Sequence, residues 1–143
     1  MNVVMLLCDA AQAVGGKLYI LGGGWSAHVV DQPLTMGVAV KVGVPWNLAN
    51  QRHKLAIVLI SEDGKPMPED NPFRVEGEFE VGRPPGVTPG TTLNVPFAVN
   101  VAGVPLPVGG YRVELSIDGT KMCEESFVVV ANPSSPRPAG PTS

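Results

Sequence analysis

The chain has 143 residues, of which 44% are hydrophobic and 16% are charged, and its formal net charge is −3. This size predicts one domain that buries its own core without disulfide support. Because the chain lacks both a basic excess and an apolar stretch of about 20 residues, we expect neither nucleic-acid binding nor membrane insertion.

The N-terminus resembles the end of a lipoprotein signal, with Leu6-Leu7 before Cys8. However, no Lys or Arg precedes the short apolar run, and Asp9 interrupts it, whereas a signal peptide has a basic start and about 7–15 apolar residues. We therefore predict a cytoplasmic protein in which Cys8 packs as a small hydrophobe. Cys123 precedes two acidic residues that disfavour a thiolate, so we expect it to be partly exposed and unreactive.

The first predicted strand is Val3–Leu7, which is apolar on both faces. Gly15-Gly16 is interpreted as the turn after it, and residues 17–30 as one long bent strand or two short ones. Gly22–Gly24 could form a phosphate-binding loop, but such a loop leads into a helix, and Trp25–Val30 has an extended pattern. We therefore interpret these glycines as a kink or bulge that lets a strand change sheets.

Alternating apolar and polar residues predict four further strands, each with one buried and one wetter face. These are Met36–Val44, Arg74–Val81, Leu93–Val101 and Tyr111–Ile117. Leu55–Ile60 and Phe127–Ala131 are apolar on both faces, which favours central strands or strands near a partner surface. Since Pro96 cannot donate to a ladder, its strand is predicted to be an edge or to have a bulge.

The remaining signals are turns and a tail. Asp63-Gly64 and Asp118-Gly119 predict tight hairpin turns, and Trp46–Gln51 a single helical turn. Residues 132–143 are rich in Pro, Ser and Gly and are predicted to be a disordered tail. Residues 1–131 then form one all-β domain of about eight strands.

Two resemblances refine this fold. Gly109–Val113 resembles the tyrosine corner of immunoglobulin domains, with Tyr111 supplying the corner hydroxyl and Val113 in the place of the cysteine. Most of the chain is similar to an uncharacterised family of small bacterial, mainly actinobacterial, proteins. The segments that carry this second resemblance are CDAAQAVGGKLYILGGGW, EDGKPM and LPVGGYRVELSIDG. Together they imply an immunoglobulin-like antiparallel β-sandwich, and they imply no catalytic residues.

The chemistry-bearing residues do not form a recognisable site. His28 and His53 have no local metal-ligand partners, so we expect no metal, cofactor or catalytic residue. His53 is flanked by cations and is predicted to be solvated. A ridge of like charges, Glu76, Glu78 and Glu80, is interpreted as a solvated outer face, with Arg112 or Lys41 as cross-strand partners.

We therefore predict a non-enzymatic protein-interaction or assembly module. Its interaction candidates are Trp25, Trp46, Tyr19 and His28. Aromatic residues dominate interfaces, but the two tryptophans could equally lie in the core. The terminal strands could pair as neighbours, or leave an edge that pairs with a protein partner or with another subunit to give a homo-oligomer.

Two alternatives belong to other classes. One is a small-ligand or carbohydrate-binding sandwich that uses Trp25, Trp46 and the acidic residues of segments 62–63 and 69–71, with Ca²⁺ assisting. The other is a hydrolase, because a catalytic triad assembles in space, although no serine lies in a Gly-x-Ser-x-Gly motif.

Overall fold

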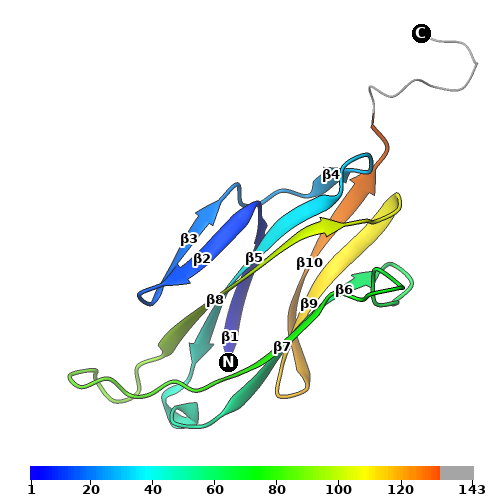
Figure 1. Ribbon diagram of the computed structural model, residues 1–143. Helices are drawn as coiled ribbons and strands as arrows, with labels where there is room; N and C mark the ends of the chain where they lie inside the picture. The colour runs from blue at the N-terminus through cyan, green and yellow to red at the C-terminus, as the bar shows by residue number, and fades with distance from the viewer. Residues whose placement is uncertain (133–143) are drawn as a thin grey trace, which may run out of the picture.

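The computed structural model describes residues 1–132, which are almost entirely β structure (Figure 1). The described residues contain ten strands, two more than predicted, and one turn of 3₁₀ helix. They are β1 (Asn2–Cys8), β2 (Ala10–Val14), β3 (Lys17–Leu21), β4 (Ala27–Val29), β5 (Leu34–Val44), η1 (Trp46–Leu48), β6 (His53–Ser61), β7 (Arg74–Phe79), β8 (Leu93–Val104), β9 (Gly109–Ile117) and β10 (Thr120–Val130). The all-β prediction is confirmed. The predicted tail lies outside the described residues, apart from Asn132, whose amide donates to Asp31.

Two sheets enclose one hydrophobic core. The strand order is β1-β5-β8 in the three-stranded sheet and β4-β10-β9-β6-β7 in the five-stranded sheet. Strands alternate as predicted, so every second side chain of β5, β6 and β9 is fully buried between the sheets. β8 lies at an edge, as Pro96 predicts. The pairing is antiparallel except between β4 and β10, which run parallel.

The terminal strands do not pair with each other, so that alternative of the sequence interpretation is wrong. β1 pairs with β5 in one sheet, whereas β10 lies between β4 and β9 in the other. The two strands instead pack against each other where the sheets meet. On one face of this strand Met5 and Leu7 lie in the core, whereas on the other face Leu6 lies against Gly23 of the folded-back chain and Val4 is 53% exposed.

A separate hairpin of β2 and β3 was not predicted as such. Gly15 and Gly16 form its two-residue turn with φ of 59° and 76°, the positive values that this tight turn needs. Ala10–Val14 is rich in alanine, which has little β preference, so no strand was expected there. The side chain of Asn100 supplies hydrogen-bond partners for this strand. Its amide oxygen accepts from the N–H of Ala11 at 2.9 Å, and its amide nitrogen donates to the Ala11 carbonyl at 2.8 Å.

The hairpin packs on the outer face of the three-stranded sheet. Cys8, Ala11 and Ala39 form a second small core there, with Leu18 and Ala98 packed against it. These small side chains allow the two layers to approach closely. Cys8 is fully buried, as predicted, and burial first, then the charge of Asp9, raises the pKa of its thiol.

Gly22–Gly24 carries the chain from this hairpin to the five-stranded sheet, so the predicted kink is confirmed. Gly22 has φ +61°, and a Cβ there would collide with the carboxylate of Asp9. Gly23 lies against the side chain of Leu6, and the Gly24 N–H donates to the Leu7 carbonyl at 2.8 Å. The chain can therefore bend here only because these positions lack side chains.

Replacing Gly22 by alanine is expected to lower the free energy of unfolding by about 1–2 kcal/mol, because an L-residue is strained at this φ and its Cβ displaces Asp9. Chemical denaturation measures this loss. Gly77→Ala is the matched control, since a Cβ at Gly77 meets nothing and the φ is ordinary. Equal stability of the two variants would contradict this account of the bend.

His53 is 4% exposed, so the prediction of a solvated side chain is wrong. Its Nδ1 lies 2.8 Å from the carboxylate of Asp118, and its Nε2 lies 3.0 Å from the carbonyl of Leu48. Asp118 also accepts the N–H of Lys54 at 2.9 Å. Because both neighbours of the ring are acceptors, both contacts are hydrogen bonds only when both ring nitrogens carry protons, so the two contacts favour the protonated ring. Burial alone would lower the pKa of His53, but the bonds to Leu48 and Asp118 outweigh it and raise the pKa.

The contacts of His53 with Asp118 and Leu48 predict that the stability of the fold depends on pH. Because the pKa of His53 is higher in the folded than in the unfolded state, protonation of its ring stabilises the fold. This stabilisation is fully present at pH values below the ordinary pKa of 6.5 and is lost as the pH rises through the folded-state pKa. Urea unfolding between about pH 5.5 and pH 8.5 should show that stability falls with pH in wild type. The fall should persist in His28→Gln and be absent in His53→Gln. A wild-type stability that is flat over this range would refute the doubly protonated ring.

Candidate functional site

Exposed apolar side chains gather on the hairpin of β2 and β3. Leu21 is 70% exposed, Val14 57% and Tyr19 56%. The register places Val14 opposite Lys17 and Tyr19 opposite Gln12, so these three apolar side chains share the face that points away from the sandwich. Isolated exposed apolar residues are common, but a group on one short strand pair is a feature of interaction surfaces.

β3 also has an open edge. It pairs only with β2 and lies on the outer side of the hairpin (Figure 1). In a two-residue hairpin the residues that flank the turn form a hydrogen-bonded pair, so Lys17, Tyr19 and Leu21 bond toward β2. The bond from the Asp9 N–H to the Leu21 carbonyl, at 2.9 Å, fits this alternation.

The backbone groups of Leu18 and Ile20 therefore point toward the open edge. Within residues 1–132, none of the backbone hydrogen bonds outside the strand ladders uses them, and β3 pairs with no strand other than β2. Ile20 is also 39% exposed, so the edge is apolar as well as unpaired. Such an edge is a template for another strand.

The other sheet edges are obstructed. β8 carries Pro96 and has the hairpin alongside it, and β1 packs against β10. β7 presents alternating charges, and β4 has only three residues. Proline, charge and shortness are the usual means by which proteins protect edges. Among the edge strands in the described part of the chain, β3 exposes the most large apolar side chains, Tyr19, Ile20 and Leu21, whereas β1 exposes Val4.

The four candidates from the sequence lie in different environments. Tyr19 is exposed on the hairpin. Trp25 packs edge-on against Phe127 at 5.3 Å between ring centroids, and its indole N–H is buried without a partner. His28, on β4, lies with its Nε2 2.5 Å from the carbonyl of Gln32. Trp46 is covered on one ring face by the guanidinium of Arg83, 4.7 Å from the ring centroid.

These four residues do not come together. Trp25 lies two residues before β4 and packs on Phe127 of β10, whereas Trp46 begins η1, two residues after the end of β5. The sequence interpretation identified Tyr19 but missed Leu21, Ile20 and Val14. The signal that could have found them is that residues 18–21 are apolar on both faces of a strand that glycines bound on both sides.

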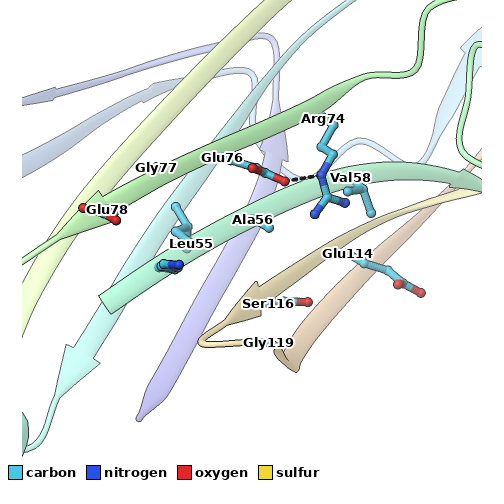
Figure 2. Close-up of a pocket in the computed structure, with 11 residues that line it drawn as sticks. Leu55, Ala56, Val58, Arg74, Glu76, Gly77, Glu78, Glu114, Ser116 and Gly119 are labelled. Carbon is cyan, nitrogen blue, oxygen red and sulfur yellow. Dashed lines mark hydrogen bonds and ion pairs between the residues drawn. The ribbon is translucent and has the colours of Figure 1, made fainter. Parts of the chain in front are cut away.

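A second surface, a shallow groove of about 650 Å³, lies on the outer face of β6, β7 and β9 (Figure 2). Its floor is formed by Ala56 and Val58. The guanidinium of Arg74 donates to Glu76 at 2.5 Å, as Figure 2 shows, and Arg52 lies 3.6 Å from Glu78. Arg74, Glu76 and Glu78 of the groove thus already have ion-pair partners.

The cross-strand partners differ from those predicted. Arg112 donates to Glu114 at 2.6 Å, and Lys121 lies 3.3 Å from the same carboxylate. The bond from Arg112, with smaller contributions from Lys121, lowers the pKa of Glu114 despite its burial. Lys41 lies in the other sheet, and Glu80 follows the end of β7. Arg112, Lys121, Glu114 and Glu124 thus form a network of paired charges on this face.

Residues 1–132 contain no group of three or more His, Cys, Asp or Glu side chains that could hold a metal ion. The acidic residues around Glu62 and Glu69 instead border a shallow depression beside Tyr111. Within the same residues, no helix is long and apolar enough to span a membrane.

Residues 3–130 match a family of unknown function, DUF6941. The chain belongs to this family. The predicted membership of an uncharacterised family is thereby confirmed, while its mainly actinobacterial origin stays a prediction. The match runs from β1 to the end of β10, so the β2–β3 hairpin is part of the family domain and not an appended segment. No curated protein matches the sequence.

Proposed function

We propose that this protein is a non-enzymatic interaction module that binds a protein strand along the open edge of β3. The observation that supports this most directly is the exposure of Leu21 and Tyr19 on a strand whose outer edge, at Leu18 and Ile20, pairs with no other strand in residues 1–132. In strand addition the main-chain bonds supply affinity, and side chains on alternate faces supply specificity. The edge of β3 offers both.

We further infer that the domain is an immunoglobulin-like sandwich. The hydroxyl of Tyr111 donates to the carbonyl of Pro107 at 2.6 Å, which is the geometry of a tyrosine corner. Tyr111 also stacks on Phe127, and β4 runs parallel to the last strand. This architecture gives a rigid support for the hairpin, but the function is argued from the surface and not from the fold.

The geometry favours this function over ligand binding. The carbohydrate alternative needs open tryptophan faces beside acidic oxygens, but Trp25 packs into the sandwich and Trp46 is covered by Arg83. Several charges of the groove already have ion-pair partners, such as Arg74 with Glu76 and Glu114 with Arg112, whereas the outer edge of β3 pairs with no strand in residues 1–132.

The proposal predicts that captured partners depend on the hairpin. Tagged protein is incubated with lysate of the native host, and bound proteins are quantified by mass spectrometry. Ile20→Pro removes an outward N–H, and the double variant Tyr19→Ser/Leu21→Ser removes the apolar face. Each should reduce the amount of specifically bound protein by at least about 90%, which corresponds to a loss of about 1.4 kcal/mol or more in binding free energy.

Val108→Ser is the matched control, because Val108 is 59% exposed but lies outside the hairpin. It should retain the partners. Circular dichroism checks that each variant folds; the serine changes are at exposed side chains, and the proline stands on an edge strand, where proline is accepted. Partners that bind all variants equally would refute the proposal.

A further inference from the structure

We infer that the strand received by β3 is β3 of a second copy of this chain, paired antiparallel about a two-fold axis at Tyr19. This inference rests on the proposed function and names its partner. The exposed edge is short, apolar and self-complementary.

The backbone groups match those of a second copy. The outward N–H and C=O groups belong to Leu18 and Ile20, which stand one residue before and one residue after Tyr19. In an antiparallel pair centred on Tyr19, Leu18 of each copy faces Ile20 of the other, and each such pair exchanges two hydrogen bonds. The four bonds satisfy all four outward groups on each copy and join the hairpins into a four-stranded sheet, β2-β3-β3-β2.

The side chains match as well. Tyr19 faces Tyr19 of the second copy in a pair without mutual hydrogen bonds, the arrangement in which side chains lie closest, with Cα atoms about 4.5 Å apart. Leu21 lies diagonal to this tyrosine pair on the same face. On the opposite face Leu18 meets Ile20 of the second copy. The most exposed apolar groups of the hairpin thus gain apolar neighbours.

Charge selects the antiparallel direction. Lys17 begins β3, and the carboxylate of Asp9 lies over Gly22, just beyond the end of β3. Both side chains are exposed, and neither has an ion-pair partner within residues 1–132. Antiparallel pairing brings Lys17 of one copy to Asp9 of the other at both ends of the interface. Parallel pairing would instead place like charges together, which is unfavourable.

The interface is small, and this sets the expected strength. A five-residue edge buries well under the about 1,200 Å² of a standard protein interface, so we expect a reversible dimer with Kd on the order of 10–100 μM. Pairing consumes the edge of β3 on both copies, so the assembly closes at two.

Sedimentation equilibrium of the full chain from about 1 μM to about 1 mM should show a monomer–dimer equilibrium with this Kd and no larger species. Ile20→Pro should be monomeric throughout, and Val108→Ser should dimerise like wild type. Lys17→Glu should weaken the dimer about tenfold, because the exposed ion pair between Lys17 and Asp9 of the second copy forms twice in the dimer. The double variant Asp9→Lys/Lys17→Glu exchanges the two charges and should restore the dimer.

A cross-linking test is independent of how well the proline variant folds. In a Cys123→Ser background, Tyr19→Cys should form an interchain disulfide on mild oxidation, since the two residues 19 face each other. Lys17→Cys should not, because the two residues 17 lie at opposite ends of the paired strands. Equal cross-linking of both variants would overturn the register.

A monomer at every concentration, with Tyr19→Cys uncrosslinked, would overturn the second copy as partner. If Ile20→Pro still abolished capture of a different protein, the proposed function would stand while this inference failed. A dimer that Ile20→Pro leaves intact would overturn it as well, because the copies would then associate through another surface.

Discussion

The amide of Asn100 is the contact on which the candidate surface depends. It bonds to both backbone groups of Ala11 and so acts as a strand neighbour for β2. A two-stranded hairpin is marginally stable alone in water. Asn100 and the small core of Cys8, Ala11 and Ala39 fix β2 on the sandwich. β2 in turn holds β3 by its inner edge, which leaves the outer edge free.

The same arrangement explains why apolar residues remain exposed on this hairpin. One face of it is used to cover the three-stranded sheet, so Leu18 is partly buried while Tyr19 and Leu21 point outward. The outer face of the five-stranded sheet, by contrast, is covered with charges that pair among themselves, such as Arg112 with Glu114. The molecule therefore has one self-sufficient polar face and one apolar edge whose contacts are incomplete.

Patterns with a local physical cause could be predicted from the sequence. The alternation of apolar and polar residues predicted the strands of the core, Asp118-Gly119 predicted a hairpin turn, and Gly22–Gly24 predicted the bend. Both signals are local, because the two-residue period of a strand and the ability to adopt positive φ are properties of the residues themselves. Tyr111 was expected to supply a corner hydroxyl through a resemblance, and its bond to Pro107 fits that expectation.

What could not be predicted depends on distant partners. Ala10–Val14 becomes a strand because Asn100 pairs with it across 89 positions of sequence. His53 is buried because Asp118, from another turn, and Leu48 supply acceptors for both ring nitrogens. The candidate site was found only in part for the same reason: which face of residues 17–21 is covered depends on how the hairpin packs.

Amide hydrogen exchange resolved at single residues tests the central claim most directly, because it reports which N–H groups of β3 have partners. In dilute protein, Tyr19 and Leu21 should exchange slowly and Leu18 and Ile20 rapidly. At concentrations well above the dimer Kd, Leu18 and Ile20 should become protected while Tyr19 and Leu21 change little. Protection of Leu18 and Ile20 that is the same at all concentrations would contradict an open edge completed by a second copy.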